Sequence, residues 1–478
     1  MLLAGGSSLL AATPNAEGAA ASANVILNNG KKRYVIVGVG SRSGYFRGAL
    51  ERGYSDHGTL VGYCDNNLGR LEMAQKGSLD RTGVKLPIYD VKDDPTAFDR
   101  MVADTKPDVV IVTTTDSTHD TYIVRGMELG CDVITEKPMT TDEHKCQRIV
   151  DTQRRTGRRC LVTFNYRYSP PRTQIKDLLM KGTIGEVLSI DFNWMLNTHH
   201  GADYFRRWHS QKRYSGGLMV HKATHHFDLV NWWLSDIPDT VMSMGKREFY
   251  VPEMARRFGL DSHHERCLTC PEKDRCGFRL NISRGGHKAL YLDHEHHDGY
   301  FRDRCVFRPD IDIEDTMNVI VKYKQNTTMS YTLNAFNSWE GYVVVFNGTL
   351  GRIEHKAQER IYISGDGTVP GAIEREGTYI RIFPLRAPAY QVDLWTGEGG
   401  HGGGDPLLQR DLFLSQKDED PYMRSADQRA GAYSILIGAA ANIGFETGSP
   451  VRIDDLVQNI GMPDYPEMPS RTAKLPMP

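Results

Sequence analysis

A buried strand that runs directly into a glycine turn and a helix constrains the fold of this chain more than any other feature. Residues 33–37 form a short apolar run rich in β-branched residues, which is typical of a buried parallel strand. Gly38 and Gly40 follow, and a helical pattern then extends to Leu50. Gly38 permits a tight turn, Gly40 lets the backbone approach a pyrophosphate, and the next helix N-terminus supplies free N–H groups. The sequence therefore predicts a dinucleotide-binding turn.

Strands and helices alternate after this turn. We expect a helix over residues 117–129 and strands at residues 59–64, 86–89, 108–113 and 132–135. This alternation predicts βαβ units and a doubly wound parallel sheet over residues 31–158. Asp65 closes the second strand 25 residues after Gly40, near the distance expected for a carboxylate on the adenosine ribose. Such a carboxylate repels a 2′-phosphate and favours NAD over NADP, although Arg70 lies nearby.

Composition excludes some classes of partner. The 478 residues are 40% hydrophobic and 25% charged, which is enough for a large core and suggests two or three domains. With 58 Lys and Arg against 60 Asp and Glu, the net charge of −2 gives no electrostatic footprint for nucleic acid or for an anionic membrane. No segment reaches the roughly 18 uninterrupted apolar residues of a membrane span.

The two ends differ from the rest of the chain. Residues 1–30 combine an apolar start with Ala21-Ser22-Ala23, which is typical of a secretory signal, but they lack its positive leading region. We therefore expect a periplasmic or exported protein. A disordered tail on a cytoplasmic protein is the alternative. Residues 456–478 contain several Pro and Met residues, and we expect an extended tail there.

Glu136-Lys137-Pro138 directly follows the fifth expected strand, and further motifs come after it. Their order resembles the Gfo/Idh/MocA family of glucose–fructose oxidoreductase, inositol dehydrogenase and rhizopine-catabolism proteins, over about residues 31–450. The motifs that carry the resemblance are the glycine turn, Asp65, the Thr-rich strand end with His119, Glu136–Pro138, Phe164–Pro170, Gly216-Gly217 with His225 and Asp228, and Ile313–Thr316.

The resemblance implies an α/β protein in two domains. The first is the Rossmann domain, and the second, over residues 159–455, contains a large open, mainly antiparallel sheet. Family members usually act on sugars, polyols or glycosides and often form dimers or tetramers through that sheet. The sequence agrees with a helix over 426–443 and strands at residues 319–323, 329–335, 341–346, 351–355 and 379–383.

Lys137 is the first catalytic candidate. Oxidation of a secondary alcohol by NAD requires a base that takes the hydroxyl proton. A lysine that is desolvated in a pocket near a cationic nicotinamide has a lowered pKa and exchanges protons near neutral pH. The resemblance places Lys137 beside the substrate hydroxyl and the nicotinamide ribose. A surface lysine on a turn is the alternative.

His221 and His225 are the second catalytic candidates. His225 matches the catalytic histidine of the family, whereas His221 stands where the family has an aspartate. This departure indicates either altered proton handling or a metal ligand, because two histidines four residues apart on one helix can chelate a single ion. Plain packing is the third reading.

The remaining site candidates come from the same segments. For the cofactor we expect contacts from Gly38, Gly40, Ser41, Arg42, Asp65, Thr114, His119, Glu136, Lys137, Asn165 and Arg167. For the substrate we expect contacts from Lys137, Arg167, Tyr204, Trp208, His225 and His401. An exposed loop around Tyr204 and a plain glycine-rich linker around His401 are the alternatives.

Histidines and cysteines gather in one part of the chain. Of the 17 histidines, 12 lie between His199 and His297, and we place an insertion at residues 261–308. This insertion contains four of the eight cysteines: Cys267, Cys270, Cys276 and Cys305. A C-x-x-C pair with two further cysteines suits a structural zinc ion. Two disulfides are the rival in an exported protein, and free thiols are the third possibility.

Together these features predict an NAD-dependent oxidoreductase that acts on a secondary hydroxyl of a sugar or glycoside, with C3 as a candidate position that gives 3-keto-glycosides. The alternative is a glycosidase that retains NAD and works by transient oxidation, elimination and re-reduction. A non-catalytic sugar-binding protein is the second alternative. We expect a small-molecule sugar as partner and assembly as a homodimer or homotetramer.

Overall fold

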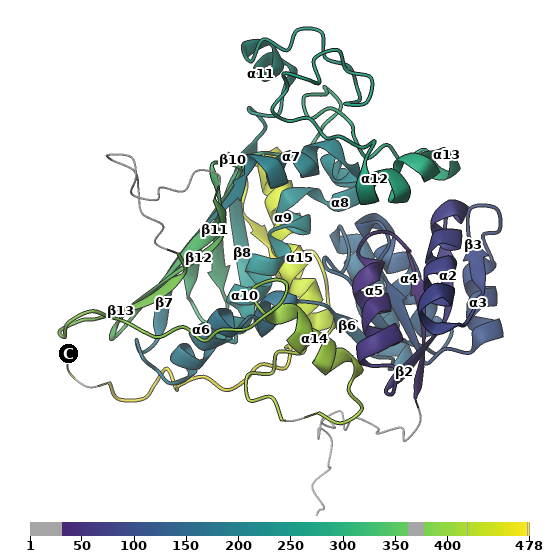
Figure 1. The fold of residues 1–478 in the computed structure, drawn as a ribbon. Helices are drawn as coiled ribbons and strands as arrows, with labels where there is room; N and C mark the ends of the chain where they lie inside the picture. Colours follow the sequence, from purple (N-terminus) through teal and green to yellow (C-terminus); the bar gives the residue numbers. More distant parts are fainter. Residues whose placement is uncertain (1–30, 362–376, 418, 476, 478) are drawn as a thin grey trace, which may run out of the picture.

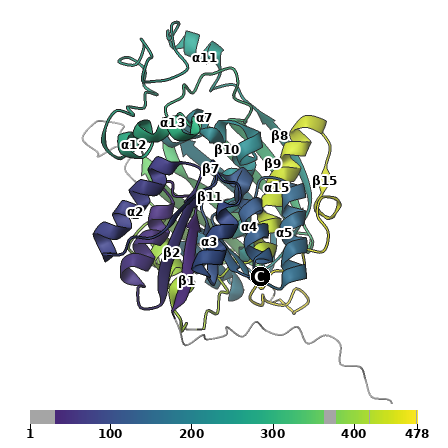
Figure 2. The ribbon, with the colours of Figure 1, turned by 90° about the vertical axis from the view of Figure 1, so that its right-hand side faces the viewer.

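Two sheets, each with its own helices, make up the described part of the chain (Figure 1, Figure 2). The computed structural model describes residues 31–361, 377–417, 419–475 and residue 477. The expected export signal lies in residues 1–30, outside the described residues, and stays a prediction. Among the described helices, none has a stretch both long and apolar enough to cross a membrane.

The first sheet is parallel throughout and confirms the expected Rossmann architecture. Its order is β3-β2-β1-β4-β5-β6, with strands β1 (Lys32–Val37), β2 (Gly58–Asp65), β3 (Ile88–Asp90), β4 (Val109–Val112), β5 (Asp132–Thr135) and β6 (Cys160–Val162). Its helices are α1 (Ser43–Gly48), η1 (Ala49–Gly53), α2 (Leu68–Thr82), α3 (Ala97–Thr105), η2 (Asp116–Thr118), α4 (His119–Glu128) and α5 (Glu143–Thr156). The strand order reverses between β1 and β4, and ligands of such sheets bind at that point.

The second sheet has nine strands and is mixed but mainly antiparallel, as the resemblance implies. Its order is β14-β13-β12-β11-β7-β10-β9-β8-β15, with strands β7 (Val187–Asn197), β8 (Pro238–Lys246), β9 (Thr316–Tyr323), β10 (Thr328–Asn337), β11 (Trp339–Gly348), β12 (Gly351–Ile361), β13 (Tyr379–Pro384), β14 (Tyr390–Gln391) and β15 (Val451–Arg452). Only the β7–β10 pair is parallel. We did not predict β7, although it lies in the middle of this sheet.

Helix α15 (Gln428–Thr447) lies between the two sheets, where it contacts β8 on one side and α5 and β6 on the other (Figure 1). The other helices of the second domain are η3 (Asn165–Tyr168), α6 (Pro170–Met180), α7 (Thr198–Arg206), η4 (Trp208–Ser210), α8 (Lys212–Ser215), α9 (Gly217–His221), α10 (Thr224–Leu234), α14 (Gly404–Phe413) and η6 (Ile453–Asp455). The parallel strand β6 extends the first sheet past residue 158, where we expected the first domain to end.

Helix α11 (Pro252–Arg257) lies just before the insertion. The helices described within the insertion are all short: α12 (Gly285–Leu290), η5 (Leu292–His294) and α13 (Glu295–Asp298). In both views α12 and α13 lie directly above α2 of the Rossmann domain (Figure 1, Figure 2). The insertion therefore reaches across from the second domain to the first.

A buried ion pair joins η3 to α10. The Arg167 guanidinium donates to the Asp228 carboxylate from Nε at 2.8 Å and from Nη2 at 2.6 Å. The two side chains are only 0% and 1% exposed, so each charge depends on the other for compensation. We expected Arg167 to contact cofactor or substrate, and the structure instead gives it a structural partner.

Removal of one member of this pair should destabilise the second domain. Arg167→Ala leaves the Asp228 carboxylate buried without a counter-charge, and we expect the free energy of unfolding to fall by about 3–5 kcal/mol. Urea unfolding followed by tryptophan fluorescence measures the change. The double variant Arg167→Met with Asp228→Leu removes both charges and should recover most of the stability. Equal losses in the single and double variants would contradict a paired role.

Candidate active site

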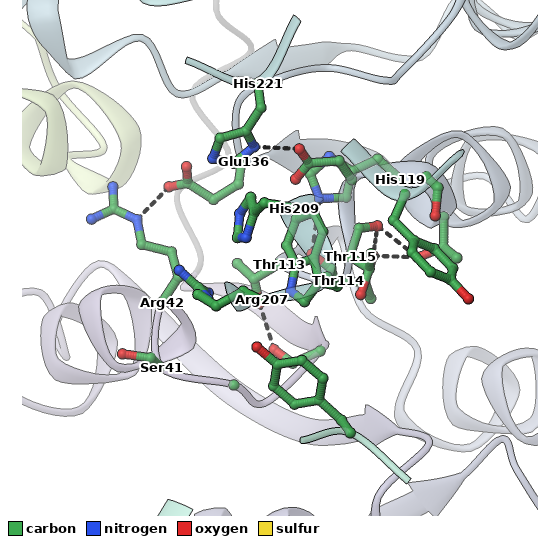
Figure 3. Close-up of a pocket in the computed structure, with 18 of the residues that line it drawn as sticks. Ser41, Arg42, Thr113, Thr114, Thr115, His119, Glu136, Arg207, His209 and His221 are labelled. Carbon is green, nitrogen blue, oxygen red and sulfur yellow. Dashed lines mark hydrogen bonds and ion pairs between the residues drawn. The ribbon is translucent and has the colours of Figure 1, made fainter. Parts of the chain in front are cut away.

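A cavity of about 1100 Å³ opens where the carboxyl ends of β1, β2, β4 and β5 face the second domain (Figure 3). The first domain contributes the glycine turn, the ends of the strands and the Glu136-Lys137 segment. The second domain contributes η4, α8, two histidines of α9 and α10, the His401 loop and part of the insertion. The cavity lies at the sheet's switch point, where a doubly wound fold binds its ligand.

The glycine turn has the shape that a dinucleotide requires. Gly38 has φ +88°, and an added Cβ would stand 2.6 Å from the Thr113 carbonyl carbon, so only glycine fits there. A Cβ on Gly40 would meet no atom within 4 Å, so this backbone faces open space in the cavity. A pyrophosphate can approach Gly40 closely because no side chain intervenes. The residues of the turn therefore fit the phosphates of NAD.

Asp65 lies at the ribose end of the same groove. Its Oδ2 accepts from the Val39 amide at 2.6 Å, and its Oδ1 accepts from the Asn67 amide at 2.9 Å. These backbone bonds fix the carboxylate at the carboxyl end of β2, where it lines the cavity. Burial raises the pKa of Asp65, and the neighbouring Arg70 opposes that shift. The carboxylate is thereby positioned for the adenosine ribose hydroxyls.

Other expected cofactor residues also line the cavity. Arg42 Nε donates to Glu136 Oε1 at 2.6 Å, so the guanidinium is held at the mouth of the glycine turn (Figure 3). The His119 ring is 2.8 Å from the Pro138 carbonyl through Nδ1 and 3.2 Å from the Thr114 carbonyl through Nε2. Burial lowers the pKa of His119. The ring therefore lies between the ends of β4 and β5, and as a neutral imidazole it donates to one of these two carbonyls. Ser41 and Asn165 line the cavity too.

Lys137, Asp116 and His221 form the centre of the site. The Lys137 ammonium donates to the His221 backbone carbonyl at 3.3 Å. The His221 imidazole pairs through Nδ1 with Asp116 Oδ2 at 2.5 Å, across the boundary between the domains. Burial lowers the pKa of Lys137 to about 8, while the Asp116 and Glu136 carboxylates oppose that shift. Lys137 therefore changes its protonation state close to neutral pH.

Burial moves the pKa values of the other two groups in opposite directions. It raises the pKa of the Asp116 carboxyl and lowers that of the His221 imidazole. Both shifts favour the neutral forms, as in a pair that shares one proton. The site thus contains a lysine and a proton-sharing pair within one desolvated cluster.

Two further histidines face the cavity. His225 stacks on the Tyr166 ring with a centroid distance of 4.2 Å, and its Nδ1 has no hydrogen-bond partner among the described residues. His209 stacks on Trp208 at 3.6 Å and meets the edge of the His221 ring at 4.2 Å. Burial lowers the pKa of both imidazoles, so they are neutral groups that each offer one hydrogen-bond donor and one acceptor.

The glycine-rich loop also reaches the site. His401 Nδ1 is 2.8 Å from Asp405 Oδ2, and the Asn165 amide donates to Asp405 Oδ1 at 2.8 Å. Both His401 and Asn165 line the cavity. The loop is thus tied to the start of the second domain, beside the catalytic cluster.

Some expected site residues lie elsewhere. Arg167 is buried against Asp228 and does not line the cavity. Tyr204 does not line the cavity either. Its hydroxyl lies 3.1 Å from His200 Nε2. His221 and His225 do not share one continuous helix, because α9 ends at His221 and α10 begins at Thr224.

The metal predictions gain no support. In the part of the chain that the structure describes, no group of three or more His, Cys, Asp or Glu side chains is arranged to hold a metal ion. All eight cysteines are free thiols, so the rival disulfides are absent as well. Burial raises the pKa of the Cys305 thiol to about 11, which keeps it protonated.

Several residues that line the cavity were not among the expected contacts, including Asp116, Arg207 and His209. Asp116 directly follows the threonines after β4, and polar residues at the carboxyl ends of parallel strands are the usual ligand contacts. That position was a usable signal. Arg207 lies between α7 and η4, within the aromatic and cationic segment 204–208, and His209 lies in η4, where no local pattern indicated a ligand contact. Figure 3 shows them with the strand-end threonines and His221.

Comparison with known proteins agrees with this geometry. The family model for the oxidoreductase family with an NAD-binding Rossmann fold matches residues 32–164, and the model for the family's C-terminal alpha/beta domain matches residues 176–453. The chain belongs to the GFO/IDH/MocA oxidoreductase family. Its first domain is therefore an NAD-binding Rossmann domain, and the glycine turn and Asp65 lie within the residues that this model matches.

Individual relatives give the extent of the likeness. A protein of Bacillus subtilis (strain 168) that is named as an oxidoreductase, YteT, is 36% identical over 437 residues, which cover 89% of this chain and 99% of the relative. Glycosyl hydrolase family 109 protein 1 of Akkermansia muciniphila is 27% identical over 194 residues, 38% of this chain and 39% of that protein.

The fold also recurs among solved structures. The WlbA dehydrogenase from Bordetella pertussis, in complex with NADH and UDP-GlcNAcA, has a TM-score of 0.56 at 18% identity, and the match covers 88% of this chain and 98% of that one. At this level of identity the match shows a shared fold alone.

The open space at Gly40 gives a direct test of the cofactor groove. Gly40→Val places a branched side chain where the pyrophosphate approaches, and we expect NAD affinity to fall at least about tenfold with little change in melting temperature. Gly53→Val is the matched control, since a Cβ there also meets nothing within 4 Å but lies outside the cavity. Calorimetric titration with NAD measures both. Unchanged affinity in Gly40→Val would place the nucleotide elsewhere.

Proposed function

We propose that this chain is an NAD-dependent oxidoreductase that moves a hydride to or from a secondary carbinol carbon of a sugar or glycoside. One observation carries the proposal. Lys137, whose pKa lies at about 8, faces the same cavity as the dinucleotide turn and stands beside the Asp116–His221 pair. A hydride acceptor and a proton acceptor are thus brought to one place, as alcohol oxidation requires.

In this proposal the residues of the cavity have separate roles in the transfer of the proton. Bound NAD supplies the hydride acceptor. The neutral amine of Lys137 takes the proton of the substrate hydroxyl as the carbon is oxidised. The carbonyl of His221 accepts from the Lys137 ammonium and so orients it after the transfer. The buried Asp116–His221 pair lies next to Lys137 and can pass that proton onward, because burial has brought both groups towards their neutral forms.

The lining of the cavity supports a sugar as substrate. Aromatic side chains that can stack on a pyranose ring also line the cavity: Trp208, Tyr214, Tyr291, Tyr300 and Phe301. His225 and His401 add hydrogen-bonding groups for hydroxyls. Two similar proteins agree in kind: an inositol 2-dehydrogenase/D-chiro-inositol 3-dehydrogenase of Lactiplantibacillus plantarum, 25% identical over 178 residues, and the WlbA dehydrogenase in complex with UDP-GlcNAcA. The identity of the sugar and the position of the hydroxyl, with C3 as a candidate, are part of the proposal.

A redox-neutral glycosidase is the second candidate, and a specific observation favours it. Hydride transfer needs one proton acceptor, whereas this cavity also contains His209, His221 and His225. Elimination of an aglycone needs a base for a C–H bond and an acid for the leaving oxygen. A neutral imidazole of this set could act as the base, and the Lys137 ammonium formed in the oxidation could act as the acid. The partial likeness to a family 109 glycosyl hydrolase points the same way.

One experiment separates the two candidates. The purified chain is denatured to identify any released nucleotide and is then incubated with glycosides and added NAD. Stoichiometric NADH with a keto product supports the dehydrogenase. Free sugar without net NADH supports the glycosidase. If no nucleotide is released and none binds, both proposals fail, and the sugar-binding alternative remains.

Substitution of Lys137 tests the proposed base. Lys137→Met should slow substrate oxidation by about 100-fold or more, because it removes the group that accepts the proton. Lys76→Met is the control, since this lysine is 76% exposed and pairs with Asp80 on α2. Steady-state kinetics on the sugar identified above measures both variants. Unchanged turnover in Lys137→Met would exclude Lys137 as the base.

The pH dependence of the reaction rate follows from the pKa of Lys137. Lys137 is an ammonium below about pH 8 and an amine above it, so oxidation should rise with pH through that value. The reverse reduction needs the proton and should fall over the same range. A profile in which both directions rise together would contradict this role.

The outer face of the nine-stranded sheet supports an oligomer. Met242, Met244 and Ile320 are exposed there, at 48%, 76% and 55%, and they alternate with buried positions on β8 and β9. We propose that a second copy covers this face, as the family resemblance implies. Met244→Lys should reduce the mass measured by light scattering towards that of a monomer. Lys322→Met is exposed on the same sheet and should leave the mass unchanged. A wild-type monomer would exclude the proposal.

A further inference from the structure

The insertion is seated on the Rossmann domain. The Asn67 side-chain amide donates to the His294 carbonyl at 2.9 Å, and the Lys92 ammonium donates to the carbonyl of His297. Contact is close at Gly69, where an added Cβ would stand 2.1 Å from His294 Nδ1. The insertion therefore lies against the start of α2, next to the ribose end of the cofactor groove.

Asp298, an acidic residue of the insertion, forms an ion pair with Arg70. The Arg70 guanidinium donates through Nη2 to Asp298 Oδ2, and the two side chains are only 9% and 8% exposed. The same Nη2 lies 3.9 Å from Asp65 Oδ1. Asp65, Arg70 and Asp298 all line the cavity. Arg70 thus stands between two carboxylates, one from each domain.

This arrangement bears on the choice between NAD and NADP. An arginine beside the end of the second strand is the group that accommodates a 2′-phosphate in NADP-binding domains. Arg70 stands in that region, but its charge is already compensated by Asp298, to which its Nη2 donates. A 2′-phosphate would also meet two carboxylates at short range, which opposes its binding.

We propose that Asp298 is a positioning residue that makes the cofactor groove select NAD over NADP by holding Arg70 in a buried ion pair. The insertion then has a function in the first domain, because it completes the adenosine end of the nucleotide site. The effect acts through Arg70, which no longer offers a free guanidinium to a 2′-phosphate.

Calorimetric titration of the full chain with NAD and with NADP, without substrate, tests the proposal. In Asp298→Asn the Arg70 guanidinium loses its anionic partner, and we expect the ratio of the NADP to the NAD dissociation constant to fall at least about tenfold. Asp298→Glu keeps the charge and should keep the wild-type ratio. Both dissociation constants in the ratio come from the same variant. Partial unfolding therefore lowers the amplitudes of both titrations and does not change the ratio.

Two further variants separate this role from a general effect. Asp293→Asn is the matched control, since Asp293 belongs to the same segment but pairs with Lys288 inside the insertion. It should leave the ratio unchanged. Addition of Arg70→Gln to Asp298→Asn should abolish the gain in NADP affinity, because the gain requires a free guanidinium.

An unchanged ratio in Asp298→Asn would overturn the inference, as would a gain that persists without Arg70. A chain that selects NAD through Asp298 but oxidises no sugar would contradict only the proposed substrate. A chain that oxidises a sugar with equal use of both nucleotides would contradict only the role of Asp298.

Discussion

The contact between Asp116 and His221 is the interaction on which the candidate site depends. The carboxylate stands at the end of β4 in the first domain, and the imidazole ends α9 in the second, with 2.5 Å between Oδ2 and Nδ1. Lys137 lies beside this contact and donates to the carbonyl of the same histidine. Neither domain contains the cluster alone, so the relative placement of the two domains is a condition for the chemistry.

Burial gives the cluster its chemical character. It lowers the pKa of Lys137 to about 8 and draws the pKa values of Asp116 and His221 towards neutral forms. In water the lysine and the aspartate would be ions with little tendency to exchange protons at neutral pH, whereas a histidine titrates at about pH 6.5. At the opposite end of the cavity, the insertion brings Asp298 to Arg70 and adds a second contact between the domains. Contacts from the second domain thus complete both ends of a groove that the first domain begins.

Much of the fold and part of the site could be predicted because their signals are local. The glycine turn, Asp65 at the end of β2 and the Glu136-Lys137 segment each combine a strand end with a functional residue in consecutive positions. The structure brings these segments to one cavity. Strand β7 was missed, although its neighbours β10 and β11 in the sheet were anticipated and its own sequence alternates buried Ile190, Phe192 and Trp194 with exposed polar residues.

The failures concern contacts between residues distant in the sequence. Arg167 was assigned to ligand binding because its segment enters the second domain near the cofactor. Only the fold shows that Asp228, 61 positions away, neutralises it in the core. Likewise, the partners Asp116 and His221 are 105 positions apart, and Arg70 and Asp298 are 228 apart. Spacing in a sequence also suggested a zinc site for cysteines that the structure leaves as free thiols.

Transfer of a labelled hydride tests the central claim most directly. The wild-type chain is incubated with NAD and a glycoside deuterated at its ring carbons, and the recovered nucleotide is examined by mass spectrometry and NMR. In a sample rapidly quenched during turnover, deuterium at C4 of the reduced nicotinamide is the predicted result, both for a chain that releases a keto product and for one that would go on to return the deuteride to the sugar. Conversion of the glycoside with no deuterium in the nucleotide would contradict the account, because the reaction would then proceed without hydride transfer in this cavity.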